Sequence, residues 1–224
     1  MTEQNRRSAP TAAAIPHKEP PPVGRFRCSA DSNGHLDDRE RLVRIVEATP
    51  WLIRALRAVR TVGIPHACVG AGAIRGAVWD HLHGYTDPSP VTDVDVAYFD
   101  ASDLSRESET GHRRRLCALE PGLVWDVVNQ AAVHVWYEGT FGRKIAPFES
   151  VEDGVGSWPE TATAVAVWLD ASGRVEVVAP CGLADLFACV VRRNPRFESV
   201  PQFRARVDAK RYQERWPSVH VVWE

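Results

Sequence analysis

Hydrophobic positions repeat along the chain with two different periods, and the switches between them predict an interleaved series of helices and strands. A spacing of three to four residues predicts helices over 36–48 and 50–62, with Thr49 as N-cap, Pro50 in the first turn and Gly63 as the stop. This interleaving indicates an α/β or α+β fold. The further predicted helices are 73–83, 102–119, 129–136, 180–191 and 202–216, and the predicted strands are 64–69, 92–99, 123–128, 161–170 and 174–178, of which the last two form a hairpin.

The first 34 residues differ in composition from the rest of the chain. Residues 1–34 contain five prolines among alanines and charged residues, which predicts a disordered tail without a packed core. The remaining residues, 35–224, are interpreted as one domain that includes the C-terminal hairpin and helices. The chain has 224 residues, of which 44% are hydrophobic, and this is sufficient for a sizeable core.

Charge and cysteine content exclude several functional classes. The net charge of −2 creates no strong general attraction to nucleic acid or to an anionic membrane. The one dense basic run, 112–115, is interpreted as a solvated helix face. Five cysteines without a Cys-x-x-Cys pair suggest neither a disulfide framework nor a structural zinc site, and they suit the reducing cytoplasm. We expect neither a signal peptide nor a membrane-spanning segment, because no apolar run is long enough.

Two aspartates in the predicted strand 92–99 are the strongest indication of chemistry. Asp93 and Asp95 are two residues apart, so a strand projects both carboxylates from the same side. Unpaired carboxylates held this close repel each other. A cation between them removes the repulsion, and hard oxygen ligands favour Mg²⁺ or Mn²⁺.

A glycine turn precedes this strand and opens the predicted helix 73–83. Gly70 and Gly72 allow a phosphate to approach the backbone, whose N–H groups point outward at the start of a helix. Arg75 follows in the first turn and is a candidate phosphate ligand. An alternative role for Arg75 is a structural ion pair with Asp80 or Asp93.

Asp126 lies in the middle of the apolar strand 123–128, where a lone carboxylate is costly unless it is paired or bound to metal. If this strand neighbours the one with Asp93 and Asp95, three carboxylates converge. Such a trio is what two-metal phosphoryl or nucleotidyl transfer requires. The alternative is that Asp126 is the buried partner of Arg75 or of a lysine.

These motifs, in this order, resemble the nucleotidyltransferase superfamily of polymerase beta type, and more narrowly a nucleotidyltransferase-like family of bacterial proteins. The resemblance runs from about residue 51 to residue 216. One departure is the turn itself, because Ala71 and Gly72 stand where the superfamily usually has Gly-Ser and therefore supply no hydroxyl. The segments that carry the resemblance are 70–75 with 78–80, 92–96, 125–130 with His134, and 158–165.

The resemblance implies a nucleotidyltransferase fold, with a mixed β-sheet, flanking helices and a small C-terminal extension. It implies Mg²⁺ (or Mn²⁺) on Asp93 and Asp95, with Asp126 as the third ligand or the base. It further implies triphosphate binding near the turn at 70–72 and Arg75. The expected activity is transfer of a nucleotidyl group from a nucleoside triphosphate to an unknown acceptor, which is a small molecule, a protein or an RNA.

Two other readings remain open from the sequence. A Rossmann-like dinucleotide or S-adenosylmethionine binder is suggested by 70–76, which approaches Gly-x-Gly-x-x-Gly, with Asp100 as a ribose ligand. A non-catalytic Mg–nucleotide sensor of the same fold would need the same carboxylates as the enzyme.

Overall fold

The computed structural model of the protein describes residues 37–197 and 199–223, and the tail predicted over 1–34 lies outside them. The helices are α1 (Asp38–Glu47), α2 (Pro50–Val62), α3 (Ala71–Leu82), α4 (Arg106–Leu119), α5 (Val133–Phe141), α6 (Val151–Val155), α7 (Ala184–Phe187), α8 (Val200–Lys210) and α9 (Tyr212–Arg215), with 3-10 turns η1 (Gln130–Ala132) and η2 (Thr161–Thr163). The strands are β1 (Cys68–Gly70), β2 (Val94–Tyr98), β3 (Trp125–Asn129), β4 (Ala166–Leu169), β5 (Val175–Val178), β6 (Val190–Arg192) and β7 (His220–Val222).

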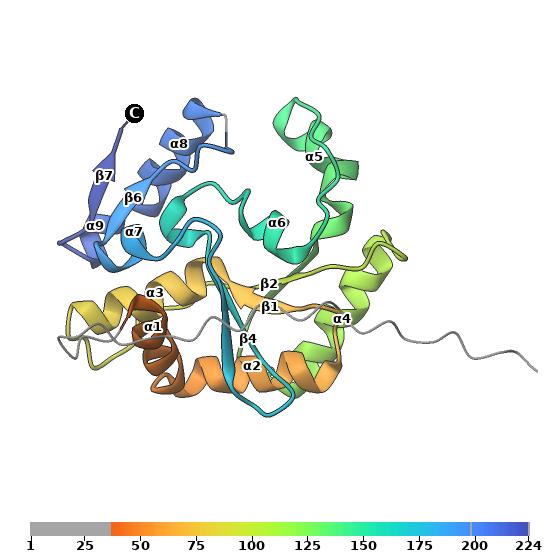
Figure 1. Cartoon of the computed structure of the whole chain (residues 1–224), viewed down its shortest axis with the longest axis horizontal. Coiled ribbons are helices and arrows are strands. Elements are labelled where there is room, and N and C mark those ends of the chain that lie inside the picture. The colour runs from red at the N-terminus through yellow and green to blue at the C-terminus, as the bar shows by residue number, and fades with distance from the viewer. Residues whose placement is uncertain (1–36, 198, 224) are drawn as a thin grey trace, which may run out of the picture.

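A five-stranded sheet forms the centre of the fold, with the strand order β3-β2-β1-β4-β5. The β2–β3 pair is parallel, whereas β1 pairs antiparallel with both β2 and β4, and β4 pairs antiparallel with β5. Figure 1 shows α2 along one side of this sheet, while α5, α6 and α8 lie on the other side. The predicted mixed sheet with flanking helices is therefore confirmed.

The alternation along β2 decides which side chains face the main core. Val94, Val96 and Tyr98 are fully buried in the large apolar cluster, which also contains residues of α1 to α4. Ala97 belongs instead to a small second cluster on the opposite face, beside α6. Asp95 shares that second face with Ala97 because strand side chains alternate.

The N-terminal helices agree with their predicted bounds, and Gly63 ends α2 in the left-handed region at φ 69°. The predicted strand 64–69 is shorter than expected because a turn, with His66 at φ 47°, delays β1 until Cys68.

The C-terminal part departs further from the prediction. The predicted strand 161–170 begins as a 3-10 turn, and its strand starts only at Ala166. The predicted helix 180–191 is the short α7 followed by β6, because Cys189 turns the chain at φ 54°. Arg211, at φ 44°, breaks the predicted helix 202–216 into α8 and α9. Neither α6 nor the parallel β6–β7 pair was predicted.

The topology rules out the Rossmann-like reading. A Rossmann unit joins two parallel strands through a helix, but α3 joins β1 and β2, which are antiparallel. The carboxylate of Asp100 accepts hydrogen bonds from the backbone N and the hydroxyl of Ser102, so it closes a turn and does not face a ribose site.

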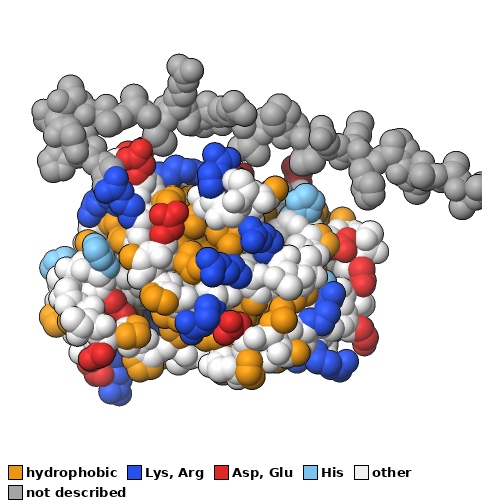
Figure 2. All heavy atoms as spheres, turned by 90° about the horizontal axis from the view of Figure 1, so that it is seen from below, with side chains coloured by type: hydrophobic (Ala, Val, Ile, Leu, Met, Phe, Trp, Pro, Cys, Tyr) orange, Lys and Arg blue, Asp and Glu red, His pale blue; other side chains and the backbone are white. Residues whose placement is uncertain are grey.

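Figure 2 shows the face over α2, where basic side chains are interspersed with hydrophobic and acidic ones. Two of the arginines of α2 have local partners: Arg54 pairs with Glu120 at 3.5 Å, and Arg60 donates to the Asp170 carbonyl. Within the described residues, no helix combines the length and the apolarity needed to cross a membrane.

Candidate active site

The turn between β1 and α3 is shaped by close packing on one side and is open on the other. A Cβ atom at Gly70 would lie 2.6 Å from the ring of Trp158 and 2.8 Å from the Val165 carbonyl, so only glycine fits there. Ala71 takes the left-handed φ of 50°, which is uncommon for a residue with a side chain, and its N–H donates to the Val165 carbonyl. The packing therefore explains Gly70 without a ligand.

Gly72 occupies the open side of this turn. A Cβ atom there would lie 4.0 Å from Oδ2 of Asp95 and 3.9 Å from Nη2 of Arg75, so the backbone borders these polar groups directly. Its N–H also acts to lower the pKa of the Asp95 carboxylate. Of the two predicted glycines, Gly72 is thus the one that faces the pocket described below.

The three predicted carboxylates come together on one face of the sheet. The parallel ladder pairs Asp95 of β2 with Asp126 of β3, so their side chains stand side by side, and Asp93 directly precedes β2. Burial, followed by the negative charges of Asp93 and Asp126, raises the pKa of Asp95 to about 6. The charge of Arg206 and the Gly72 N–H act in the opposite direction.

Asp126 is exposed, because β3 is the edge strand of the sheet. The expectation of a buried Asp126 was wrong, and so was the alternative that it is the buried partner of Arg75 or a lysine. Its neighbours Trp125 and Val127 point to the opposite, core face. Over residues 37–197 and 199–223, no group of three or more His, Cys, Asp and Glu side chains is arranged to hold a metal ion by itself.

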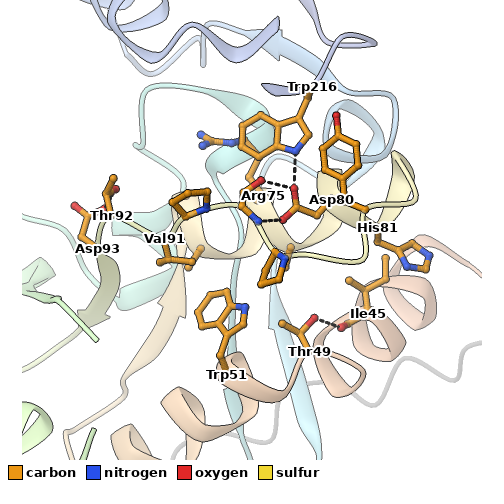
Figure 3. Close-up of a pocket in the computed structure, with 18 of the residues that line it drawn as sticks. Ile45, Thr49, Trp51, Arg75, Asp80, His81, Val91, Thr92, Asp93 and Trp216 are labelled. Atoms are coloured by element: carbon orange, nitrogen blue, oxygen red, sulfur yellow. Dashed lines mark hydrogen bonds between the residues drawn. The ribbon is translucent and has the colours of Figure 1, made fainter. Parts of the chain in front are cut away.

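A cavity of about 340 Å³ opens beside this carboxylate cluster. Figure 3 shows Asp93 and Thr92 at one end of it and Ile45, Thr49 and His81 at the other. The cavity is also lined by Gly72, Arg75, Asp95, Arg206 and Lys210. Acidic and basic side chains therefore line the same space.

Arg75 is buried deeper than a flexible phosphate ligand would be. Only 6% of the residue is exposed, and its guanidinium lies 5.1, 4.7 and 5.7 Å from the ring centres of Trp79, Tyr212 and Trp216. Its Nη1 lies 3.7 Å from the carboxylate of Glu160. The ion pair considered from the sequence exists, but its partner is Glu160 rather than Asp80 or Asp93.

Asp80, which the sequence suggested as an ion-pair partner of Arg75, instead binds Ser89 and Trp216. Its carboxylate accepts hydrogen bonds from the backbone N and hydroxyl of Ser89 and from Nε1 of Trp216 (Figure 3). These bonds fix the loop after α3, which forms part of the cavity wall.

Glu160 connects Arg75 to the cavity. This carboxylate is fully buried, and its Oε1 accepts hydrogen bonds from Nε of Arg206 and from the hydroxyl of Tyr212, both at 2.8 Å. The charge of Asp95 acts on Arg206 from the other side. Glu160 thus holds Arg206 at the cavity wall, facing the aspartates.

Sequence reasoning missed Arg206 and Lys210 as site residues. They lie four positions apart on α8, so both project from one side of that helix into the cavity. This spacing was visible in the sequence. More than 100 residues separate α8 from Asp93 and Asp95, and this distance hid the connection.

The raised pKa of Asp95 predicts a pH-dependent effect of Asp95→Asn on stability. The folded-state pKa of about 6 lies above the unfolded value of 3.8, so ionised Asp95 destabilises the folded protein. This destabilisation is absent well below pH 3.8, grows as the pH rises between the two pKa values, and is complete once the pH is well above 6. The variant should raise the free energy of unfolding by about 2–3 kcal/mol at pH 7.5. Urea unfolding between pH 4 and 8 measures this. Asp208→Asn, at an exposed position on α8, is the control, and a gain from Asp95→Asn that stays constant down to pH 4 would contradict the assignment.

Comparisons with known proteins bear on the family and the fold of the chain. A family model described as nucleotidyltransferase matches residues 57–221. An NMR structure described as revealing a CCA-adding enzyme head domain is 25% identical, with a TM-score of 0.71, over 84% of this chain and 97% of that one. A Thermotoga maritima CCA-adding enzyme complexed with tRNA is 15% identical, with a TM-score of 0.47, over 83% of this chain and 42% of that one. No curated protein sequence matches. Because the family model covers most of the chain and the fold agrees, this protein belongs to the nucleotidyltransferase family.

Proposed function

We propose that the protein transfers a nucleotidyl group from a Mg²⁺-bound nucleoside triphosphate to a hydroxyl group of an acceptor. The observation that carries this proposal is the cavity with Asp93 and Asp95 on one wall and Arg206 and Lys210 on another. The carboxylates suit a divalent cation, and the basic side chains suit the phosphates that accompany it.

The carboxylate set fits Mg²⁺. Burial and then the like charges of Asp93 and Asp126 raise the pKa of Asp95, and a divalent cation would remove the charge repulsion. Mg²⁺ is usually bound by one or two carboxylates together with substrate phosphates, rather than by a complete protein cage. The donors present suit this mode: Asp93 and Asp95 would hold the ion first, with Asp126 as a third ligand. When bound, the ion would polarise the α-phosphate and neutralise the leaving group.

The phosphates of the nucleotide have separate candidate partners. The Gly72 backbone borders Asp95, and the Arg206 side chain faces the same end of the cavity. Lys210 lies one helical turn further along α8. In this arrangement Arg75 affects phosphate binding indirectly, because it pairs with Glu160 and Glu160 orients Arg206. The guanidinium of Arg75 itself stays among the aromatic rings.

The chemical step has a simple balance. An oxygen of the acceptor hydroxyl forms a bond to the α-phosphorus, and the bond between the α- and β-phosphates breaks, so that pyrophosphate leaves with the electron pair. The hydroxyl proton passes to a carboxylate. Asp126 is our candidate for this base, because it is exposed on the edge strand directly beside Asp95. The alternative role of Asp126 is the third metal ligand.

Calorimetric titration of the four nucleoside triphosphates, with and without Mg²⁺, tests this proposal. We expect at least one triphosphate to bind only when Mg²⁺ is present. Arg206→Gln should weaken that binding about tenfold, because a charge-assisted contact to phosphate is lost. Arg204→Gln, an exposed position on the same helix, is the matched control. Binding that persists in EDTA, or equal affinities for both variants, would overturn the proposal.

A further inference from the structure

A second open cavity, of about 370 Å³, is bordered by Asp126. It is lined by Asp126, Val127 and Val128 of β3 and by residues of α4 and α5. Asp95, on the neighbouring strand, borders the first cavity. Because the ladder sets Asp95 beside Asp126, the two cavities border neighbouring carboxylates.

Basic side chains form the wall that α4 contributes to this cavity. Arg106 and Arg113 lie seven residues apart, which places both on one side of the helix. Within the described part of the chain, neither guanidinium has a hydrogen bond or a close ion pair, although the charges of both act on the carboxylate of Glu109. Glu109 lies between them, but its carboxylate is bound to the backbone N–H of Asn129 at 2.9 Å. The two guanidinium groups are therefore available to an anionic ligand.

The wall from α5 supplies an aromatic ring and a hydroxyl. Trp136 and Thr140 are four residues apart and both line the cavity. Trp136 is partly exposed, so its ring is accessible to a flat partner. Aromatic rings bind nucleic-acid bases by stacking, and such contacts tolerate different bases.

We propose that this second cavity binds the acceptor and that the acceptor is a nucleotide: its base stacks on Trp136 and its phosphate contacts Arg106 and Arg113. This inference rests on the proposed function. A nucleotide bound here would direct a sugar hydroxyl toward Asp126, which takes the proton while the hydroxyl oxygen bonds to the α-phosphorus and pyrophosphate leaves. The volume of the cavity is at the lower end of the range for small-ligand sites, which suits a single nucleotide unit.

The test is a titration of candidate acceptors into protein whose first cavity is already occupied by a triphosphate analogue. The protein is loaded with Mg²⁺ and the non-hydrolysable α,β-methylene analogue of the triphosphate that binds in the titration described above. We then titrate separately AMP, CMP, GMP, UMP and a tetranucleotide RNA with a free 3′-hydroxyl. Adenosine, which lacks the phosphate, and inorganic phosphate, which lacks the nucleoside, serve as partial ligands. We expect at least one mononucleotide or the RNA to bind, and each partial ligand to bind more weakly. A mononucleotide alone would identify a free nucleotide as acceptor, and the RNA alone would identify an RNA end.

Variants decide whether that binding occurs in the second cavity. Arg113→Gln and Trp136→Leu should each weaken it about tenfold, whereas Arg114→Gln, the exposed neighbour outside the cavity, should change it less than about twofold. Absence of binding, or binding that neither variant weakens, would overturn the inference. If the α,β-methylene analogues of all four triphosphates fail to load, the proposed function fails. In that case the same titrations are made on unloaded protein. Weaker binding by the Arg113→Gln and Trp136→Leu variants would still support a nucleotide site in the second cavity, and unchanged binding would overturn it.

Discussion

Replacing Asp93 and Asp95 together by asparagine should abolish Mg²⁺-dependent nucleotide binding and lower nucleotidyl transfer by at least about a thousandfold. A bound metal contributes several kcal/mol to stabilising the charge that develops in the transition state, and asparagine is a poor ligand for Mg²⁺. The change keeps the size and much of the hydrogen-bonding capacity of both side chains. The fold should therefore survive, and near neutral pH it should be more stable, because the burial of a charged carboxylate and the charge repulsion, which together raise the pKa of Asp95, are removed.

The control for this double variant removes two negative charges elsewhere. Asp208→Asn combined with Glu214→Gln changes exposed positions that do not line the cavity. Calorimetry with Mg²⁺ and triphosphate, together with circular dichroism melting, compares the two proteins. Unchanged Mg²⁺-dependent nucleotide binding in the Asp93/Asp95 variant would show that the metal is held by other groups.

Glu160→Ala should be the most destabilising single substitution in the site, by about 3–5 kcal/mol. It removes the buried carboxylate that pairs with Arg75 and Arg206 and accepts the hydroxyl bond of Tyr212. The Arg75 guanidinium would then be left in the interior without a counter-charge. Urea unfolding measures the loss, and Glu152→Ala, an exposed acid on α6, is the control.

A double-mutant cycle separates the structural role of this ion pair from its role in the site. Glu160→Met combined with Arg75→Met replaces two buried charges by apolar groups, and it should cost far less stability than Glu160→Met alone. Its KM for triphosphate should still rise, because Arg206 has lost the carboxylate that orients it. Additive losses of stability would contradict the coupling, and an unchanged KM would contradict the positioning role.

The sequence predicted those parts of the site that are formed by residues close together in the chain. The side-by-side carboxylates follow from strand alternation in 92–99, and the glycine turn before α3 was recognisable because Gly70 and Gly72 stand close together. The Rossmann alternative could not be rejected from sequence, because it differs in the direction of β1 relative to β2, which depends on pairing and not on local pattern.

What the sequence could not provide comes from contacts between distant segments. The carboxylate of Glu160 meets Arg75 and Arg206, which lie 85 positions before it and 46 positions after it. The exposure of Asp126 follows from the edge position of β3, whereas its apolar neighbours suggested burial. The pair β6–β7, which joins residues 30 apart, also has no local signal, because each of its strands is only three residues long.

Release of pyrophosphate is the most direct measure of the central claim. The purified protein is incubated with Mg²⁺, triphosphates labelled on the α-phosphate, and separate acceptor pools of small molecules, proteins and RNA. We predict equal amounts of labelled product and pyrophosphate in at least one pool, and neither with EDTA or with the Asp93/Asp95 asparagine variant. Mg²⁺-dependent nucleotide binding without pyrophosphate release in any pool would contradict transfer and would indicate a nucleotide sensor of the same fold.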